Sequence, residues 1–132
     1  MLKLDNVSSS YGESRVIKNV SLEISSGRFF AILGKNGMGK TTLLKTIMGL
    51  MDRSEGEISL DEKNISKVST NLRAKYGLGY VPQGRGILPQ FTVQENMMIG
   101  SFAREKENLN NVNEDVEFVL KLFPILKDFQ KR

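Results

Sequence analysis

The sequence predicts a domain of the α/β class, because three features follow one another in the order that such a fold requires. Short apolar runs that suit strands occupy much of residues 1–81, a cluster of glycines separates one of these runs from a helical pattern at about Lys40, and helical patterns dominate after Pro89. A length of 132 residues is enough for one domain with a real core.

Five strands are expected. Leu2–Val7 and Val20–Ile24 carry spaced apolar side chains in the manner of half-buried strands, and Phe29–Leu33 is a continuous apolar run, which is typical of a strand buried on both faces. Two further strands are predicted at Gly56–Leu60 and Leu78–Val81, and the proline after the last one cannot continue a central ladder.

Three helices are expected. The first begins at about Lys40 and ends at Gly49, and its apolar side is predicted to consist of Leu43, Leu44, Ile47 and Met48. The second begins after Thr92, which forms a capping box with Glu95, and is expected to run to about Phe102. The third has an apolar face at i, i+3, i+4, i+7 and closes at Pro124; its core-facing residues are predicted to be Val116, Val119, Leu120 and Phe123.

The composition restricts the chemistry. The chain has no cysteine and no histidine, so any catalysis has to use backbone amides, lysine, hydroxyls, carboxylates or a metal held through oxygen. The net charge of +4 is modest and its basic residues are dispersed, which disfavours nucleic-acid binding. No apolar run approaches the roughly 18 residues that a membrane span requires.

One motif carries specific chemistry. Residues 34–41 read GKNGMGKT and fit G-x-x-x-x-G-K-[ST], the pattern of a phosphate-binding loop. Glycines let consecutive N–H groups turn toward a phosphate, and the helix that follows adds the positive end of its dipole. Lys40 is expected to reach the β- and γ-phosphates, Thr41 to offer its hydroxyl to Mg²⁺, and Thr42 to donate near the α-phosphate.

Two more residues could contribute to a nucleotide site together with this loop. Tyr11 could stack on a purine, and Gln83, which follows a predicted strand and a proline, could reach toward a metal or an attacking water. Taken alone, Tyr11 is equally well explained as a surface tyrosine on an edge strand, and Gln83 is better explained as a turn glutamine.

Together these residues resemble the nucleotide-binding subunit of ABC transporters. Tyr11 stands where that family stacks adenine, Val16 where it packs beside the base, "GKNGMGKTT" at the Walker A loop, and Gln83 at the Q-loop. The resemblance implies ATP and Mg²⁺ as cofactors, Lys40 and Gln83 as catalytic residues, and Thr41 and Gln83 as metal ligands. The nucleotide-binding residues that it implies are Tyr11, Val16, Gly34, Asn36, Gly37, Met38, Gly39, Lys40, Thr41 and Thr42.

A longer stretch narrows the resemblance. "GYVPQGRGILPQFTVQENMMIG", residues 79–100, is similar to the importers of branched-chain amino acids and urea. The pairing of "GKTTLLKTIMGL" with "VPQGR" is closer to the urea branch, whereas Gly86 and Leu88 depart from the acidic residue and the phenylalanine usual there.

The resemblance also implies an architecture. Residues 1–90 would form an N-terminal antiparallel β subdomain with the first part of a P-loop NTPase core, and residues 91–132 the start of an α-helical subdomain. An LSGGQ-type signature, a Walker B strand with a catalytic glutamate and a switch histidine do not occur in the sequence, so the C-terminal half of the core is expected to be missing. We expect the intact subunit to be an ATPase, whereas the 132-residue piece should bind nucleotide weakly at best and not turn over. Without the missing half, Phe29–Leu33 would be left with unpaired backbone and exposed apolar surface, so the piece alone is expected to aggregate or to be partly ordered.

The implied partners are a second ATP-binding subunit and permease subunits, the latter contacting the region Arg85–Phe91, with the protein peripheral on the cytoplasmic face of the plasma membrane. Packing within the helical subdomain is an equal explanation of that region. Two other functions stay open: a soluble ABC-type ATPase of DNA repair or translation, which salt-sensitive nucleic-acid binding would support, and a non-hydrolytic nucleotide-binding module.

Overall fold

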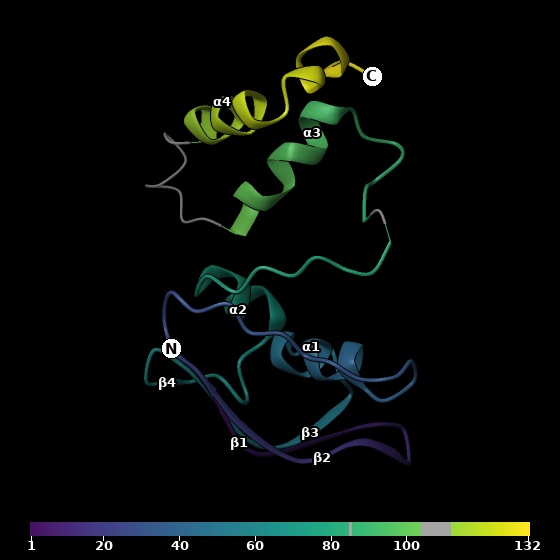
Figure 1. Cartoon of the computed structure of the whole chain (residues 1–132), viewed down its shortest axis with the longest axis vertical. Coiled ribbons are helices and arrows are strands. Elements are labelled where there is room, and N and C mark those ends of the chain that lie inside the picture. The colour runs from purple at the N-terminus through teal and green to yellow at the C-terminus, as the bar shows by residue number, and fades with distance from the viewer. Residues whose placement is uncertain (85, 104–111) are drawn as a thin grey trace. The chain divides into compact units, whose positions relative to one another are not determined.

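The computed structural model describes residues 1–84, 86–103 and 112–132, and these residues form two compact units. The first unit, Met1–Leu78, contains a sheet and two helices, and the second, Gly79–Arg132, is helical (Figure 1).

The first unit is built on a four-stranded antiparallel sheet. Its order is β2 (Ser14–Ile24), β1 (Leu2–Tyr11), β3 (Arg53–Leu60) and β4 (Lys63–Asn64). Leu4 of β1 pairs with Leu22 on one side and with Ile58 on the other, which places apolar side chains in register. The expected antiparallel β subdomain is therefore confirmed.

One apolar core joins this sheet to α1 (Lys40–Met48), which lies across one face of the sheet in Figure 1. The helix ends at Gly49, whose left-handed conformation (φ 74°) terminates it as predicted. The buried apolar residues of this core are Leu4, Val7, Ile17, Leu43, Ile47, Ile58 and Ile65. Leu44 is 43% exposed, so its predicted place on the buried side was wrong; Thr42 and Thr46 are buried there instead.

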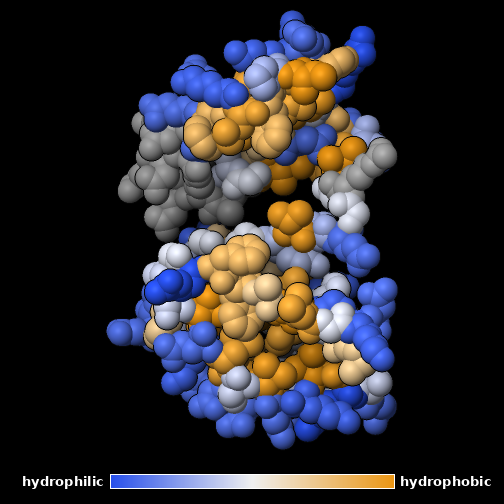
Figure 2. Space-filling view, in the orientation of Figure 1, coloured by the Kyte–Doolittle hydropathy of each residue, from blue (hydrophilic) through white to orange (hydrophobic). Residues whose placement is uncertain are grey.

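The predicted strand Phe29–Leu33 is not a strand in the part of the chain that the structure describes. Phe29 and Leu33 are 96% and 90% exposed, and only Ile32 packs against the core. A strand buried on both faces needs a ladder partner and cover, and the described residues supply neither. Unpaired, exposed apolar residues are what the sequence predicted for this segment, and Figure 2 shows apolar surface on the same unit.

The predicted strand Leu78–Val81 was wrong for the same reason. These residues have no ladder partner among those described, and the Val81 side chain is 87% exposed. By contrast, the short helix α2 (Thr70–Lys75) and the two-residue β4 carry no pattern that predicted them.

The second unit consists of α3 (Val93–Met98), the 3-10 turn η1 (Ile99–Ala103), α4 (Val112–Leu122) and the 3-10 turn η3 (Pro124–Phe129). The capping box is confirmed: Thr92 Oγ1 accepts from Glu95 N at 3.2 Å, and a Glu95 carboxylate oxygen accepts from Thr92 N at 2.7 Å. In α4, Leu120 is buried and Val116 and Val119 are half-buried.

Phe123, predicted to face the core from α4, was placed wrongly. It lies beyond the helix at the N-cap of η3, with a backbone that is neither helical nor extended (φ −128°, ψ 73°), and its side chain is 58% exposed. Pro124 sets the dihedral angle of the following turn and restricts the residue before it, so the helical periodicity ends one residue sooner than the apolar pattern.

Candidate phosphate-binding site

The glycine loop joins the exposed apolar segment to α1. Gly37 and Gly39 both have left-handed backbones, with φ of 80° and 87°. A Cβ at Gly39 would also lie 2.9 Å from Ile17 Cδ1, so two independent constraints require glycine there. Leu43 N donates to the Gly39 carbonyl at 2.8 Å, which begins the helix directly after the loop.

Lys40 folds back over this loop. Its ammonium group donates to the carbonyls of Gly34 and Lys35, each at 2.7 Å, and its side chain is half-buried. Carbonyl oxygens are neutral acceptors, whereas a phosphate oxygen would add the attraction between opposite charges to the hydrogen bond. A phosphate oxygen placed in the loop would therefore be a better partner for Lys40 than either carbonyl.

The first turn of α1 is open to an anion. Its N-cap, Gly39, makes no side-chain cap bond, and no acidic residue stands in the first turn. The first N–H groups of a helix have no partner within it and carry the positive end of its dipole. Thr41, the predicted metal ligand, is exposed beside them, whereas Thr42 is 8% exposed.

The hairpin of β1 and β2 carries the two residues predicted to contact a base. Val16 lies against the loop, because its Cγ1 would be 3.4 Å from a Cβ at Gly39. Tyr11 ends β1 next to the turn at Gly12, pairs with Ser14, and has a side chain that is 45% exposed. All the predicted nucleotide-binding residues therefore belong to the first unit.

The other predicted residues lie elsewhere. Gln83 is an exposed residue of the second unit, outside any helix or strand, so it does not belong to the unit that holds the loop. Arg85 lies outside the described residues. Within the described ranges there is no cluster of three or more acidic side chains that could hold a metal ion.

A buried arginine was missed by sequence reasoning. Arg73 of α2 is 2% exposed and contacts the C-terminal end of α1, the helix that carries the loop. An arginine in the last turn of a helix is ordinarily a solvated residue near the negative end of the dipole, so its position gave no signal.

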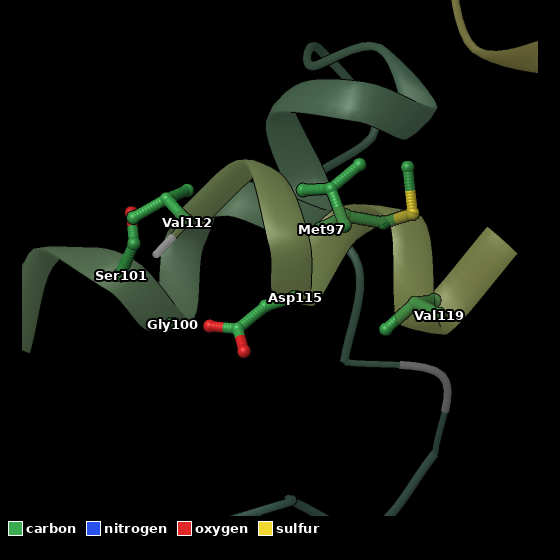
Figure 3. Close-up of a pocket in the computed structure, with 7 residues that line it drawn as sticks. Met97, Gly100, Ser101, Val112, Asp115 and Val119 are labelled. Atoms are coloured by element: carbon green, nitrogen blue, oxygen red, sulfur yellow. The ribbon is translucent and has the colours of Figure 1, made fainter. Parts of the chain in front are cut away.

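The second unit contains a hollow of about 270 Å³ between η1 and α4, shown in Figure 3. Its described lining is mostly apolar; Figure 3 shows Val112 beside Ser101 at one end and Val119 at the other, with Met97 and Asp115 between them. The described residues that line it include no basic side chain.

Comparisons with known proteins agree with this geometry. A family model described as "ABC transporter" matches residues 17–132. The chain is 33% identical over 132 residues to the probable branched-chain amino acid transport ATP-binding protein LivF of Archaeoglobus fulgidus, covering all of this chain and 55% of that protein. It is 38% identical over 98 residues to the lipopolysaccharide export system ATP-binding protein LptB of Haemophilus influenzae, covering 74% of this chain and 41% of that protein.

Among solved structures, a dimeric bacterial ABC transporter cassette superimposes with a TM-score of 0.80 at 30% identity, covering 100% of this chain and 61% of the other. A related dimeric structure, in a post-hydrolysis state bound to ADP and Pi, gives a TM-score of 0.79 at 30% identity, covering 100% of this chain and 61% of the other. The chain spans about half the length of the curated relatives that it matches.

Proposed function

The chain belongs to the ABC transporter family, and from that premise we propose that it is part of an ATP-binding subunit that couples ATP binding and hydrolysis to import through a membrane permease. The observation that carries the proposal is the loop at the start of α1: two left-handed glycines, open helix N–H groups and a lysine held by two neutral carbonyls. This arrangement fits a polyphosphate, since it gathers donors and positive charge at one point.

Each residue of the phosphate-binding site has a proposed role. The backbone N–H groups of Gly37–Thr41 and the Lys40 ammonium would bind and orient the phosphates, and the hydroxyl of Thr41 would hold Mg²⁺. Gln83 is proposed as a metal ligand and catalytic residue from the family resemblance alone. When bound, Mg²⁺ neutralises charge that develops on the phosphate oxygens. Tyr11 and Val16 cover the base. Hydrolysis is proposed for the complete protein, in which two ATP-binding subunits face each other, and the dimeric cassettes support that assembly.

The transported substrate is proposed to be a branched-chain amino acid or urea. Relatives named for branched-chain amino acid transport cover 97–100% of this chain, whereas the lipopolysaccharide-export and ribose-import relatives cover 74–80%. Urea is kept because "VPQGR" stands close to the urea branch. A membrane preparation that carries the complete system should take up one of these two substrates only when ATP is supplied, and uptake of neither would reject this choice.

The permease is proposed to contact the second unit near Phe91. An apolar groove there is lined by Ile87, Leu88, Pro89, Phe91, Val93, Asn96, Met97, Leu126, Phe129 and Arg132. Asn96 holds the groove's loop, because it accepts from Leu88 N at 2.8 Å and donates to the Leu88, Phe91 and Thr92 carbonyls at 3.0–3.1 Å. None of the described helices is long and apolar enough to cross a bilayer.

Nucleotide binding is tested with Lys40→Ala and the matched control Lys35→Ala. Lys35 lies in the same loop and is exposed, and only its backbone carbonyl contacts Lys40. Loss of a charged hydrogen bond costs about 1.5–3 kcal/mol, so the dissociation constant for Mg·ATP, measured with a fluorescent ATP analogue, should rise about 10- to 100-fold for Lys40→Ala. Lys35→Ala should change it less than about threefold.

Equal binding by the wild-type chain and Lys40→Ala would reject the assignment of the loop. Multiple-turnover phosphate release by the 132-residue chain, abolished by Lys40→Ala, would instead reject the proposal that hydrolysis belongs to the assembled protein. The thermal midpoint of Lys40→Ala should stay within a few degrees of the wild-type value, because a cation at a helix N-terminus does not stabilise the helix.

A further inference from the structure

The inference concerns Arg73, a buried cation whose partners are neutral. Its guanidinium donates from Nη1 to the carbonyls of Thr46 (3.1 Å) and Ile47 (2.7 Å) at the C-terminal end of α1. It also donates from Nε to Val68 O and from Nη2 to Ser66 O, each at 2.9 Å. Neither of the two ion pairs found within the described residues includes Arg73.

Placing a cation there without a counter-ion has a cost. Burial lowers the pKa of the Arg73 guanidinium from its ordinary value, although arginine stays protonated in proteins. The compensating groups are the last carbonyls of α1, which have no partner within the helix and carry the negative end of its dipole. Arg73 therefore replaces water at the end of this particular helix and ties it to the turn before α2.

The same end of α1 is fixed from two other sides. Thr70 Oγ1 donates to the Gly49 carbonyl at 2.8 Å, and the Ser9 and Thr46 hydroxyls, the first in β1, lie 2.7 Å apart. Thr46 Oγ1 in turn donates to Thr42 O at 2.7 Å. Because Thr46 uses its only proton in that bond, Ser9 is the donor between the two hydroxyls.

Gly49 shows how closely Arg73 fits. A Cβ at Gly49 would lie 3.0 Å from both Cζ and Nε of Arg73, so the guanidinium occupies the space that a side chain would need. The α-helix between this end and the glycine loop has nine residues and is therefore only about 13 Å long. A rigid rod of that length transmits a tilt at one end to the other, where the phosphate donors begin.

We propose that Arg73 is a positioning residue for nucleotide binding: by clamping the C-terminal end of α1 to the Ser66–Val68 turn, it sets the direction of the helix and hence the place of its N-terminal phosphate donors. The proposal rests on the proposed function of the loop. Arg73 itself contacts no part of the loop in the interactions that the structure describes.

The test compares Arg73→Met, Arg73→Lys and the control Lys67→Met. Lys67 lies between Ser66 and Val68, carries the same charge and is exposed, so its loss matches the charge change without touching α1. The dissociation constant for a fluorescent ATP analogue with Mg²⁺ is measured at least 20 °C below each variant's thermal midpoint, where every sample is fully folded. A purely structural role for Arg73 would lower the midpoint and leave this constant unchanged.

A misplacement of reacting groups by about 1 Å can lower the rate of an enzyme about 100-fold. We expect a smaller effect on binding, with the dissociation constant rising about tenfold in Arg73→Met. Arg73→Lys, which restores the charge without the fork of donors, should fall between Arg73→Met and the wild type, and Lys67→Met should bind like the wild type. If Arg73→Met does not fold, the affinity of Arg73→Lys tests the proposal instead, and its dissociation constant should rise about threefold.

Wild-type affinity in a folded Arg73→Met, or in Arg73→Lys where that variant decides, would overturn the proposal for Arg73 and leave the proposed function intact. Equal weakening in Lys67→Met would also overturn it, since the effect would then follow net charge. A wild-type chain that fails to bind the analogue would overturn both proposals.

Discussion

Lys40 and Arg73 place positive charge at the two ends of α1, with opposite consequences. At the C-terminal end, Arg73 meets carbonyls that lack helical partners, so its charge favours the folded helix. At the N-terminal end, the Lys40 charge stands against the helix dipole and has only two carbonyl acceptors. An anion bound between the first turn of α1 and the Lys40 ammonium would therefore be stabilised by both groups.

The side chains of α1 show how far single residues could be read from the sequence. Gly39, Lys40 and Thr41 are predicted to bind phosphate because such a site restricts each position to a few residue types, and their role stays a prediction. Leu44 was misplaced because the apolar pattern allows a wide stripe, whereas the sheet covers a narrower one that includes Thr42 and Thr46. Arg73 could not be predicted, since its partners are backbone carbonyls from distant segments, which have no sequence signature.

Leu43 and Leu44 provide a direct comparison on one helix. Leu43 is 7% exposed within the core, and Leu44 is 43% exposed. Truncation of a buried leucine costs about 2–5 kcal/mol, so Leu43→Ala should lower the free energy of unfolding by that amount, while Leu44→Ala should cost less than about 1.5 kcal/mol. Urea denaturation followed by circular dichroism measures both values, and equal losses would show that the buried face of α1 is assigned wrongly.

At the scale of elements, features that depend on residues close together in the sequence were predicted correctly, and features that depend on distant segments were not. The capping box before α3 and the glycine at the end of α1 were predicted because each acts within a few residues. The strand predicted at Phe29–Leu33 has the right composition but no ladder partner among the described residues. The composition of a segment indicates which faces of a strand would be buried, but the strand forms only where other segments of the chain supply ladder partners.

The cap of α3 gives a pH dependence. The hydrogen bond from the Thr92 backbone N–H, followed by the one from its hydroxyl, lowers the pKa of Glu95 from its ordinary value. Because the pKa is lower in the folded state, the cap's contribution is complete above the unfolded pKa of about 4.3 and is lost as the pH falls through the folded pKa. Protection of the α3 amides, measured relative to their intrinsic exchange rates at each pH, should therefore decrease below about pH 4.3 in the wild type.

Glu95→Gln tests the origin of that dependence, with Glu117→Gln on the exposed side of α4 as its control. Glu95→Gln should remove most of the acid-dependent change in α3 exchange, because glutamine bonds the same donors without titrating. The Glu117→Gln control should keep the acid-dependent change in α3 exchange. An unchanged pH profile in Glu95→Gln would mean that another group governs the acid response of α3.

For the whole molecule, the most prominent feature is apolar surface before the glycine loop. Phe29 and Leu33 are almost fully exposed, while Ile32, between them, packs against the core. Exposed apolar clusters favour association between molecules. The whole-chain prediction of partial order or aggregation follows from these residues.

We expect Phe29→Lys with Leu33→Lys to reduce light scattering of the purified chain several-fold while leaving its urea midpoint nearly unchanged, because surface substitutions usually stay within about 0.5 kcal/mol. Ile32→Lys serves as the matched control and should lower the midpoint, since it places a charge against the core. A large loss of stability in the double variant would show that Phe29 and Leu33 are covered in solution.

The central claim, that the glycine loop and the first turn of α1 bind the phosphates of ATP through backbone N–H groups, is tested most directly by hydrogen exchange at single amides with and without Mg·ATP. Exchange should slow by about tenfold or more at Gly37–Thr42, where donors become bonded, and should hardly change in β3. Unchanged exchange at Gly37–Thr42 under saturating nucleotide, or protection confined to the second unit, would contradict the claim.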